Sequence, residues 1–160
     1  MDMEFCGLTV EANLTLKFFA MFSRFEFALK VAGFRQNGSE EVKASWRKFA
    51  DEISVKFDAS VLPNIQRSFD YITSHPPRVL FIQNGKLDWE DDPLEDGLSN
   101  ARQALDLIQR IRNNFFHGGK FVPDLVAPPE RDRHLLENAL VILTACIKII
   151  PEVLDAYSAQ

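Results

Sequence analysis

Apolar residues recur at the spacing of an α-helix through most of this chain. The clearest example lies between about residues 10 and 34, where large apolar side chains follow one another every three or four positions: Leu14, Phe18, Phe22, Phe25 and Leu29. Gly33 stands where such a helix would end, and Phe19 and Phe27 widen its apolar surface. The pattern predicts a long amphipathic helix that contacts more than one neighbour.

Four further segments carry the same helical pattern. They are expected at about residues 41–57, 59–74, 99–117 and 130–157. Pro63 fits the first turn of the third helix, and either Ser99 or Asn100 can cap the fourth. Pro151 is expected to kink or break the last helix. Together these segments predict an all-α fold, a compact up-and-down bundle of about five helices.

A different pattern interrupts the helices around residues 78–89. Residues 78–82 and 86–89 are rich in apolar and aromatic side chains, and Gln83-Asn84-Gly85 lies between them. An Asn-Gly pair between two such runs is typical of a tight turn, so a small β-hairpin insertion is expected here. The acidic residues 90–96 that follow are expected to form a solvated surface loop without chemistry of their own.

Length and composition favour a single domain over residues 1–160. The chain has 160 residues, of which 46% are apolar, which is enough for one hydrophobic core and too little for two. Its 14 Phe, against 2 Tyr and 2 Trp, predict a large apolar contact surface in the core or across a dimer interface. The net charge of −5 argues against a broad nucleic-acid-binding surface, although a local basic site is compatible with it.

The sequence carries no pattern typical of export, of a membrane span or of a metal site. The N-terminal segment is acidic where a signal peptide is basic, and the apolar run 139–151 is interrupted by Thr144 and Lys148. Cys6 and Cys146 lack metal-binding or redox spacing, so both are expected to be reduced thiols of a cytoplasmic protein. No metal or cofactor is expected, because the acidic loop also lacks ligand spacing in its carboxylates: Asp91, Asp92, Glu95 and Asp96.

One position on the fourth predicted helix breaks the apolar pattern. Arg112 falls where the periodicity puts a core side chain, and a buried guanidinium is costly unless a carboxylate, a phosphate or water lies beside it. His117 falls near the end of that helix, where the helix dipole favours the charged ring and nearby basic residues favour the neutral one. His117 is therefore able to exchange a proton near neutral pH. Asn113 lies one turn earlier and could orient the imidazole or a substrate oxygen.

The HEPN (higher eukaryote and prokaryote nucleotide-binding) domain family has an R-x(4–6)-H signature, which resembles the segment RNNFFHGGK that begins at Arg112. Arg112 matches the family arginine, Asn113 the polar residue after it, and His117 the family histidine. The likeness extends to a Gly pair after the histidine and a final long helix, whereas the Arg/His spacing alone is common. Arg110 also stands at an allowed distance from His117, but Arg112 is preferred because Asn113 follows it directly.

This resemblance implies a metal-independent endoribonuclease that uses the 2′-hydroxyl of RNA and leaves a 2′,3′-cyclic phosphate, with a site completed across a homodimer. In that reaction His117 would be the general acid or base, Arg112 would stabilise phosphoryl charge, and Asn113 would orient a phosphoryl oxygen. Three nearby polar residues are the candidates for binding substrate: Arg110, Asn114 and Lys120.

The resemblance also implies a biological setting, a toxin or defence effector with a cognate antitoxin or nucleotidyltransferase as partner. In many such toxins the partner nucleotidyltransferase modifies a Tyr two residues after the histidine. This chain has Gly119 at that position, which argues against neutralisation by modification there.

Other interpretations of the same residues stay open. Arg112 could be a structural residue held by Glu26 of the first helix, although Glu26 could equally pair with Lys30. The chain would then be a non-catalytic HEPN module that binds RNA, a nucleotide or a protein partner, or a structural helical dimerisation protein. His75 and His134 are expected to be a turn residue and a polar helix residue without a catalytic role.

Overall fold

The computed structural model describes residues 10–38, 40–116 and 128–159. In chain order its elements are α1 (Ala12–Val31), α2 (Trp46–Lys56), the π-helical turn η1 (Phe57–Val61), α3 (Leu62–Ser74), β1 (Val79–Gln83), β2 (Lys86–Glu90), α4 (Asn100–Phe116), α5 (Pro129–Ile147) and α6 (Pro151–Ser158). The described residues thus form a helical bundle with one small antiparallel sheet. This confirms the predicted all-α class and its hairpin insertion.

The second predicted helix begins later than expected, at Trp46 instead of near residue 41. Ala44, shortly before this helix, instead forms an isolated antiparallel bridge with Arg35. Ser45 then caps α2, because its hydroxyl accepts a hydrogen bond from the Lys48 N–H at 3.3 Å. A strong cap next to a bridged segment overrides the apolar spacing that had suggested the earlier start.

Two junctions between helices also differ from a simple bundle. α2 continues through η1 directly into α3, so no loop separates the second and third predicted helices. Pro151 breaks the last predicted helix, because α5 ends at Ile147 and Pro151 begins the separate helix α6.

Aromatic side chains from α1 and α2 fill the centre of the bundle. The Trp46 ring lies 4.8 Å from the Phe22 ring and 5.2 Å from the Phe25 ring, measured between centroids. Four Phe side chains are completely buried: Phe18, Phe25, Phe49 and Phe57. The Phe-rich contact surface expected from the composition therefore lies mainly in the core. Phe27 and Phe116 are exceptions, since both are more than half exposed.

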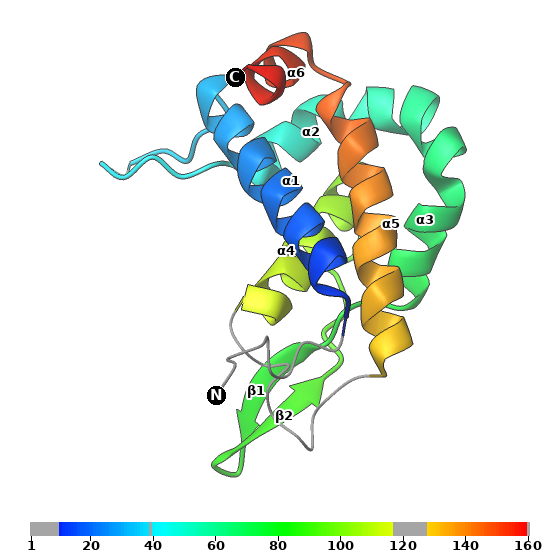
Figure 1. The fold of residues 1–160 in the computed structure, drawn as a ribbon. Coiled ribbons are helices and arrows are strands. Elements are labelled where there is room, and N and C mark those ends of the chain that lie inside the picture. Colours follow the sequence, from blue (N-terminus) through cyan, green and yellow to red (C-terminus); the bar gives the residue numbers. More distant parts are fainter. Residues whose placement is uncertain (1–9, 39, 117–127, 160) are drawn as a thin grey trace.

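The helices pack around this core as Figure 1 shows, with α1 against α5 and α6, α2 against α4, and α3 against α5. The buried face of α4 extends from Ala101 to Ile111, and the residues after Ile111 are only partly buried or exposed. The last turn of α4 thus emerges at the edge of the core. No described helix has the length and apolar character needed to cross a membrane.

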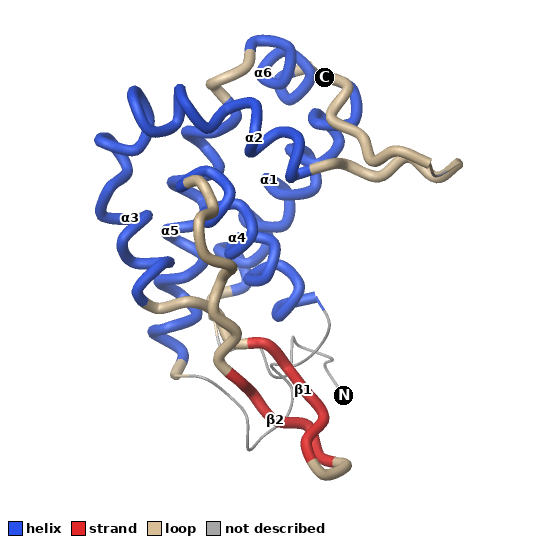
Figure 2. The backbone as a smooth tube through the Cα atoms, turned by 180° about the vertical axis from the view of Figure 1, so that it is seen from behind, coloured by secondary structure: helices blue, strands red, loops and turns tan. Residues whose placement is uncertain are grey.

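The hairpin projects from the end of the bundle at which α4 finishes (Figures 1 and 2). β1 and β2 pair with Gln83 opposite Lys86, and the turn between them is Asn84-Gly85. Both turn residues are left-handed, with φ of 51° at Asn84 and 76° at Gly85, as a type I′ turn requires. The Asn-Gly pair therefore forms the tight turn that the sequence predicts.

Candidate functional site at the end of α4

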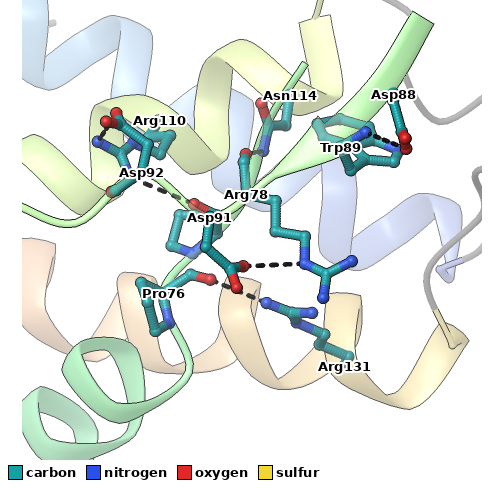
Figure 3. Close-up of polar contacts among 10 residues, drawn as sticks. Pro76, Arg78, Asp88, Trp89, Asp91, Asp92, Arg110, Asn114 and Arg131 are labelled. Carbon is teal, nitrogen blue, oxygen red and sulfur yellow. Dashed lines mark hydrogen bonds and ion pairs between the residues drawn. The ribbon is translucent and has the colours of Figure 1, made fainter. Parts of the chain in front are cut away.

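The C-terminal half of α4 is tied to the base of the hairpin. Arg110 donates from Nη2 to Asp92 Oδ2 at 2.7 Å and from Nη1 to the Asp92 carbonyl at 2.6 Å. One turn later, the side-chain amide of Asn114 donates to the carbonyl of Arg78 at 2.7 Å (Figure 3). These charge-assisted and neutral hydrogen bonds fix the position of the hairpin relative to α4.

Two further contacts extend this attachment (Figure 3). Arg78 Nε lies 3.0 Å from Asp91 Oδ1, and Arg131 of α5 donates to the Pro76 carbonyl at 2.8 Å. The acidic loop, in which the sequence indicates no chemistry, therefore supplies two carboxylates that hold arginines near the hairpin. We find a structural role for Asp91 and Asp92.

A groove of about 520 Å³ runs along this side of α4, between the helix and residues 92–98. We call it the hairpin-side groove. Six α4 side chains line it: Arg102, Asp106, Gln109, Arg110, Asn113 and Asn114. Arg102 pairs with Asp106 at 2.7 Å, and Arg110 pairs with Asp92 at the same distance. Both arginines of this groove therefore have a carboxylate partner.

A second groove, of about 320 Å³, separates the last turn of α4 from α1. We call it the α1-side groove. It is mainly apolar, and its lining residues are Leu16, Phe19, Ala20, Phe22, Ser23, Glu26, Arg112 and Phe116. The guanidinium carbon of Arg112 lies 4.5 Å from the centroid of the Phe116 ring and 5.7 Å from that of Phe22. Cation–π attraction to two rings therefore holds this guanidinium.

The polar contacts of Arg112 are few for a guanidinium with five N–H donors. Its Nη1 donates to Asn113 Oδ1 at 3.0 Å, and its Nε is buried with no hydrogen-bond partner. Glu26 lines the same groove, but no ion pair joins it to Arg112 among the described residues. A buried donor without an acceptor costs about 1–3 kcal/mol.

The structure brings some of the predicted site residues together. Arg112 and Asn113 are hydrogen-bonded to each other, and Glu26 shares the α1-side groove with Arg112. Glu26 therefore lies where the structural interpretation of Arg112 requires it, but it does not make the ion pair on which that interpretation depends.

The other predicted site residues lie elsewhere. Arg110 and Asn114 are on the hairpin side of α4, where their side chains hold Asp92 and the Arg78 carbonyl. Their expected role in binding substrate thus competes with a structural one. His117 and Lys120 lie outside the described residues.

Sequence reasoning missed three residues of this site. Phe22 and Phe116 hold the Arg112 guanidinium, and Asp92 neutralises Arg110. Phe116 could have been found from its i+4 spacing to Arg112 on one helix face. No local signal in the sequence identifies Asp92 or Phe22 as partners, because each belongs to an element distant along the chain.

A separate groove of about 500 Å³ lies between α3 and α5, and sequence reasoning placed no function on it. The Tyr71 ring stacks on the His75 ring at 4.7 Å and lies 5.6 Å from the His134 ring. Burial raises the pKa of Tyr71, and the positive charge of Arg131 opposes that rise. The ring contacts and the side-chain pairs of His134 with Glu130 and Glu137 give both histidines partners within the fold. Their lack of a catalytic role stays a prediction.

Cys146 is completely buried in α5, and burial raises the pKa of its thiol to about 12. The thiol therefore stays protonated and unreactive at neutral pH. Cys6 lies outside the described residues. Within the described ranges, no group of three or more His, Cys, Asp or Glu side chains is arranged to hold a metal ion.

The described residues form a helical bundle in which Arg112, held by aromatic rings, lies near the end of α4, and a hairpin is anchored to Arg110 and Asn114 of the same helix. Comparison with known proteins gives no matching family model, no matching curated protein and no matching solved structure. The HEPN resemblance therefore rests on the motif residues Arg112, Asn113 and His117, and it stays a prediction.

Proposed function

We propose that this protein is a metal-independent endoribonuclease of the HEPN type, in which Arg112 and His117 act on the phosphodiester. The observation that carries the proposal is the state of Arg112. Phe22 and Phe116 hold its guanidinium, no carboxylate pairs with it among the described residues, and its buried Nε has no acceptor. A phosphate can bind such a guanidinium without first displacing a carboxylate.

In the proposed reaction the 2′-hydroxyl oxygen attacks the neighbouring phosphorus, the bond from phosphorus to the 5′-oxygen breaks, and a 2′,3′-cyclic phosphate forms. His117, which follows the last residue of α4 in the sequence, takes the 2′-hydroxyl proton or gives a proton to the leaving 5′-oxygen. Arg112 stabilises the charge that builds on the phosphoryl oxygens, and Asn113 keeps the guanidinium oriented. A homodimer would supply a second His117 for the other proton transfer.

The lining of the α1-side groove supports RNA as the substrate. The Phe116 ring is 57% exposed and lies 4.4 Å from the Phe19 ring, so its free surface is available to a base. Stacking of unpaired bases on aromatic side chains is a general mode of single-stranded RNA binding. It would compensate for the lack of a broad basic surface in a protein with a net charge of −5.

A fluorogenic RNA assay with the purified full chain tests this proposal. We expect cleavage that survives EDTA and products that end in a 2′,3′-cyclic phosphate. His117→Ala should lower the rate by about 10²-fold or more at an unchanged melting temperature, since general acid–base catalysis is typically worth that much. Activity that is lost on chelation and restored by Mg²⁺ or Mn²⁺ would contradict the mechanism, and so would a His117→Ala variant as active as the wild type.

A non-catalytic module that binds RNA or a nucleotide is the second candidate. Among the described residues, Arg112 is the one cation that lines the α1-side groove, which is enough to bind a phosphate but little for phosphoryl transfer. Titration of a short labelled RNA separates the candidates. Binding that needs Arg112 without cleavage would support the second candidate, and neither binding nor cleavage would leave a structural dimerisation protein.

The proposal includes a cytoplasmic toxin or defence effector with a cognate antitoxin or nucleotidyltransferase. The free buried thiol of Cys146 agrees with a reducing compartment. Induced expression in a bacterial host should arrest growth with the wild type and not with His117→Ala. Equal growth with both chains would argue against the toxin role.

A further inference from the structure

The hairpin carries an apolar face that is exposed toward the turn and partly buried toward the bundle. Directly opposite residues of an antiparallel pair point to the same face, so the pairs Leu80–Trp89 and Ile82–Leu87 place four apolar side chains together. Ile82 is 75% exposed and Leu87 is 49% exposed. Phe81, on the other face, is 42% exposed. Apolar side chains gathered on a projecting element are typical of a surface that contacts a partner.

The outer edge of β1 has open backbone groups. The two-residue turn makes Gln83 and Lys86 a hydrogen-bonded pair, and hydrogen-bonded and non-hydrogen-bonded pairs alternate along the strands. Leu80 and Ile82 are therefore in non-hydrogen-bonded pairs, and their N–H and C=O groups point away from β2. In the described part of the chain, no hydrogen bond reaches these outward groups.

The two edges of the hairpin differ in their protection against strand addition. β1, with the sequence VLFIQ, contains neither a charged residue nor a proline. β2 carries a charge at every second position: Lys86, Asp88 and Glu90. Charged residues and prolines are the usual means by which proteins block an exposed edge. The unprotected edge is therefore β1.

The sequence of β1 fits a second copy of itself. In an antiparallel pair about a twofold axis through Phe81, Leu80 lies opposite Ile82 of the second copy, and Ile82 lies opposite its Leu80. The two residues whose backbone groups point outward then bond to each other, which gives four hydrogen bonds across the axis. The same operation on β2 would set Asp88 directly opposite Asp88, a like-charge pair that is unfavourable.

We propose that the outer edge of β1 pairs with β1 of a second copy of this chain, forming a four-stranded antiparallel sheet about a twofold axis at Phe81. Leu80, Ile82 and Leu87 of both copies then share one apolar face. The two helical bundles lie at opposite ends of this sheet, because the hairpin projects from the end of the bundle (Figures 1 and 2). This dimer does not depend on the proposed ribonuclease activity. Because it puts the two α4 ends at opposite ends of the sheet, it is a contact separate from the one that would bring a second His117 to the proposed site.

Matched proline substitutions of the full chain test which edge is used. Ile82→Pro removes an outward N–H of β1, and Leu87→Pro removes the equivalent N–H of β2; neither donor bonds to the other strand of the hairpin. By sedimentation, we expect a wild-type dimer at tens of micromolar. Ile82→Pro should raise the dissociation constant about tenfold or more, since two hydrogen bonds are lost per dimer, and Leu87→Pro should leave it nearly unchanged.

Cysteine cross-linking tests the register and also decides the matter if the proline variants fail to fold. In a Cys6→Ser background, Phe81→Cys places two thiols at the twofold axis, where Cα atoms of a non-hydrogen-bonded pair are about 4.5 Å apart, within reach of a disulfide. Gln83→Cys is the control, because its two copies would lie roughly 13 Å apart along the strands. Cys146 does not interfere, since it is buried.

Mild oxidation should give a covalent dimer with Phe81→Cys and a monomer with Gln83→Cys. A wild-type protein that stays monomeric at tens of micromolar would overturn the proposal. A dimer that responds equally to both proline variants, or that cross-links equally through both cysteines, would show a different interface and would overturn it too.

Discussion

The two sides of the last turns of α4 are built in opposite ways, as Arg110 and Arg112 show. Arg110 faces the hairpin-side groove, is 16% exposed in its side chain, and binds both the carboxylate and the carbonyl of Asp92. Arg112 faces the α1-side groove and is held by the rings of Phe22 and Phe116. Two arginines that are two residues apart therefore have different roles. The elements that surround each side chain determine its role, because the residue type is the same.

The two guanidinium groups differ in their hydrogen-bond and charge partners. Arg110 has its charge neutralised and several of its donors bonded, so an incoming phosphate would have to displace Asp92. Arg112 has rings in place of a carboxylate and one buried donor without an acceptor. The first arrangement stabilises the attachment of the hairpin, and the second is suited to an anion.

The largest effect expected from this comparison is on RNA cleavage. Arg112→Ala should lower the rate about 10²–10³-fold, as is usual when one donor to a developing oxyanion is removed. Arg112→Lys should also lose most activity, because it keeps the charge but not the planar fork that holds two phosphate oxygens. Arg110→Ala is the matched control and should stay within a few-fold of the wild type. If Arg110→Ala removes cleavage and Arg112→Ala does not, the assignment of the two grooves is reversed.

The next largest effect is on stability, and here we expect Arg110→Ala to be the more harmful of the two substitutions. Arg110→Ala should lower the free energy of unfolding by about 1–3 kcal/mol, because it breaks two charge-assisted hydrogen bonds to Asp92 and removes a mostly buried side chain. Thermal denaturation should show this as a shift of about 2–4 °C per kcal/mol for a chain of this size. Arg112→Ala should change the free energy by less than about 1 kcal/mol, since the lost ring contacts are offset by removal of an unbonded buried donor.

The fold was largely predictable because its signals are local. The spacing of Phe18, Phe22 and Phe25 predicts α1, and the Asn84-Gly85 pair predicts both the hairpin and its turn. The start of α2 was predicted too early because the apolar pattern continues N-terminally through residues that in fact pair with the segment after α1. The direct passage of α2 into α3 was not predicted. Pro63 indicates the first turn of a separate helix, so one helix was expected to end at about residue 57 and the next to begin at about residue 59.

The site was only partly predictable because its contacts are not local. The position of Arg112 on the apolar face of its helix marked it as unusual, and the structure agrees that it needs a special environment. Which groups would supply that environment could not be deduced, because Phe22 lies 90 positions earlier in the sequence. Asp92 was assigned to a solvated loop for the same reason, since its pairing with Arg110 exists only once the hairpin is docked.

A smaller effect separates the adjacent asparagines Asn113 and Asn114. Asn114→Ala should cost about 1 kcal/mol of stability, the usual net value of one hydrogen bond, because its amide bonds the Arg78 carbonyl. Cleavage should stay near the wild-type rate. Asn113→Ala should leave the melting temperature nearly unchanged and lower cleavage several-fold, because Asn113 orients Arg112 and is itself exposed. Equal effects of both variants on cleavage would show that Asn113 does not act through Arg112.

The smallest effect on stability is expected at Glu26. A substitution there tests whether this carboxylate pairs with Arg112. If Glu26 does not pair with Arg112, Glu26→Gln should change the free energy of unfolding by less than about 0.5 kcal/mol, as for other substitutions that break no contact. If it did hold a buried Arg112, breaking the pair would cost about 3–5 kcal/mol.

Removing a negative charge from the α1-side groove should also raise the affinity for a short RNA a few-fold, most clearly at low salt. Glu52→Gln, an exposed carboxylate of α2 away from the groove, is the control and should change neither quantity. A large loss of stability in Glu26→Gln alone would make Arg112 a structural residue like Arg110, and the two sides of α4 would then differ only in which carboxylate neutralises the arginine.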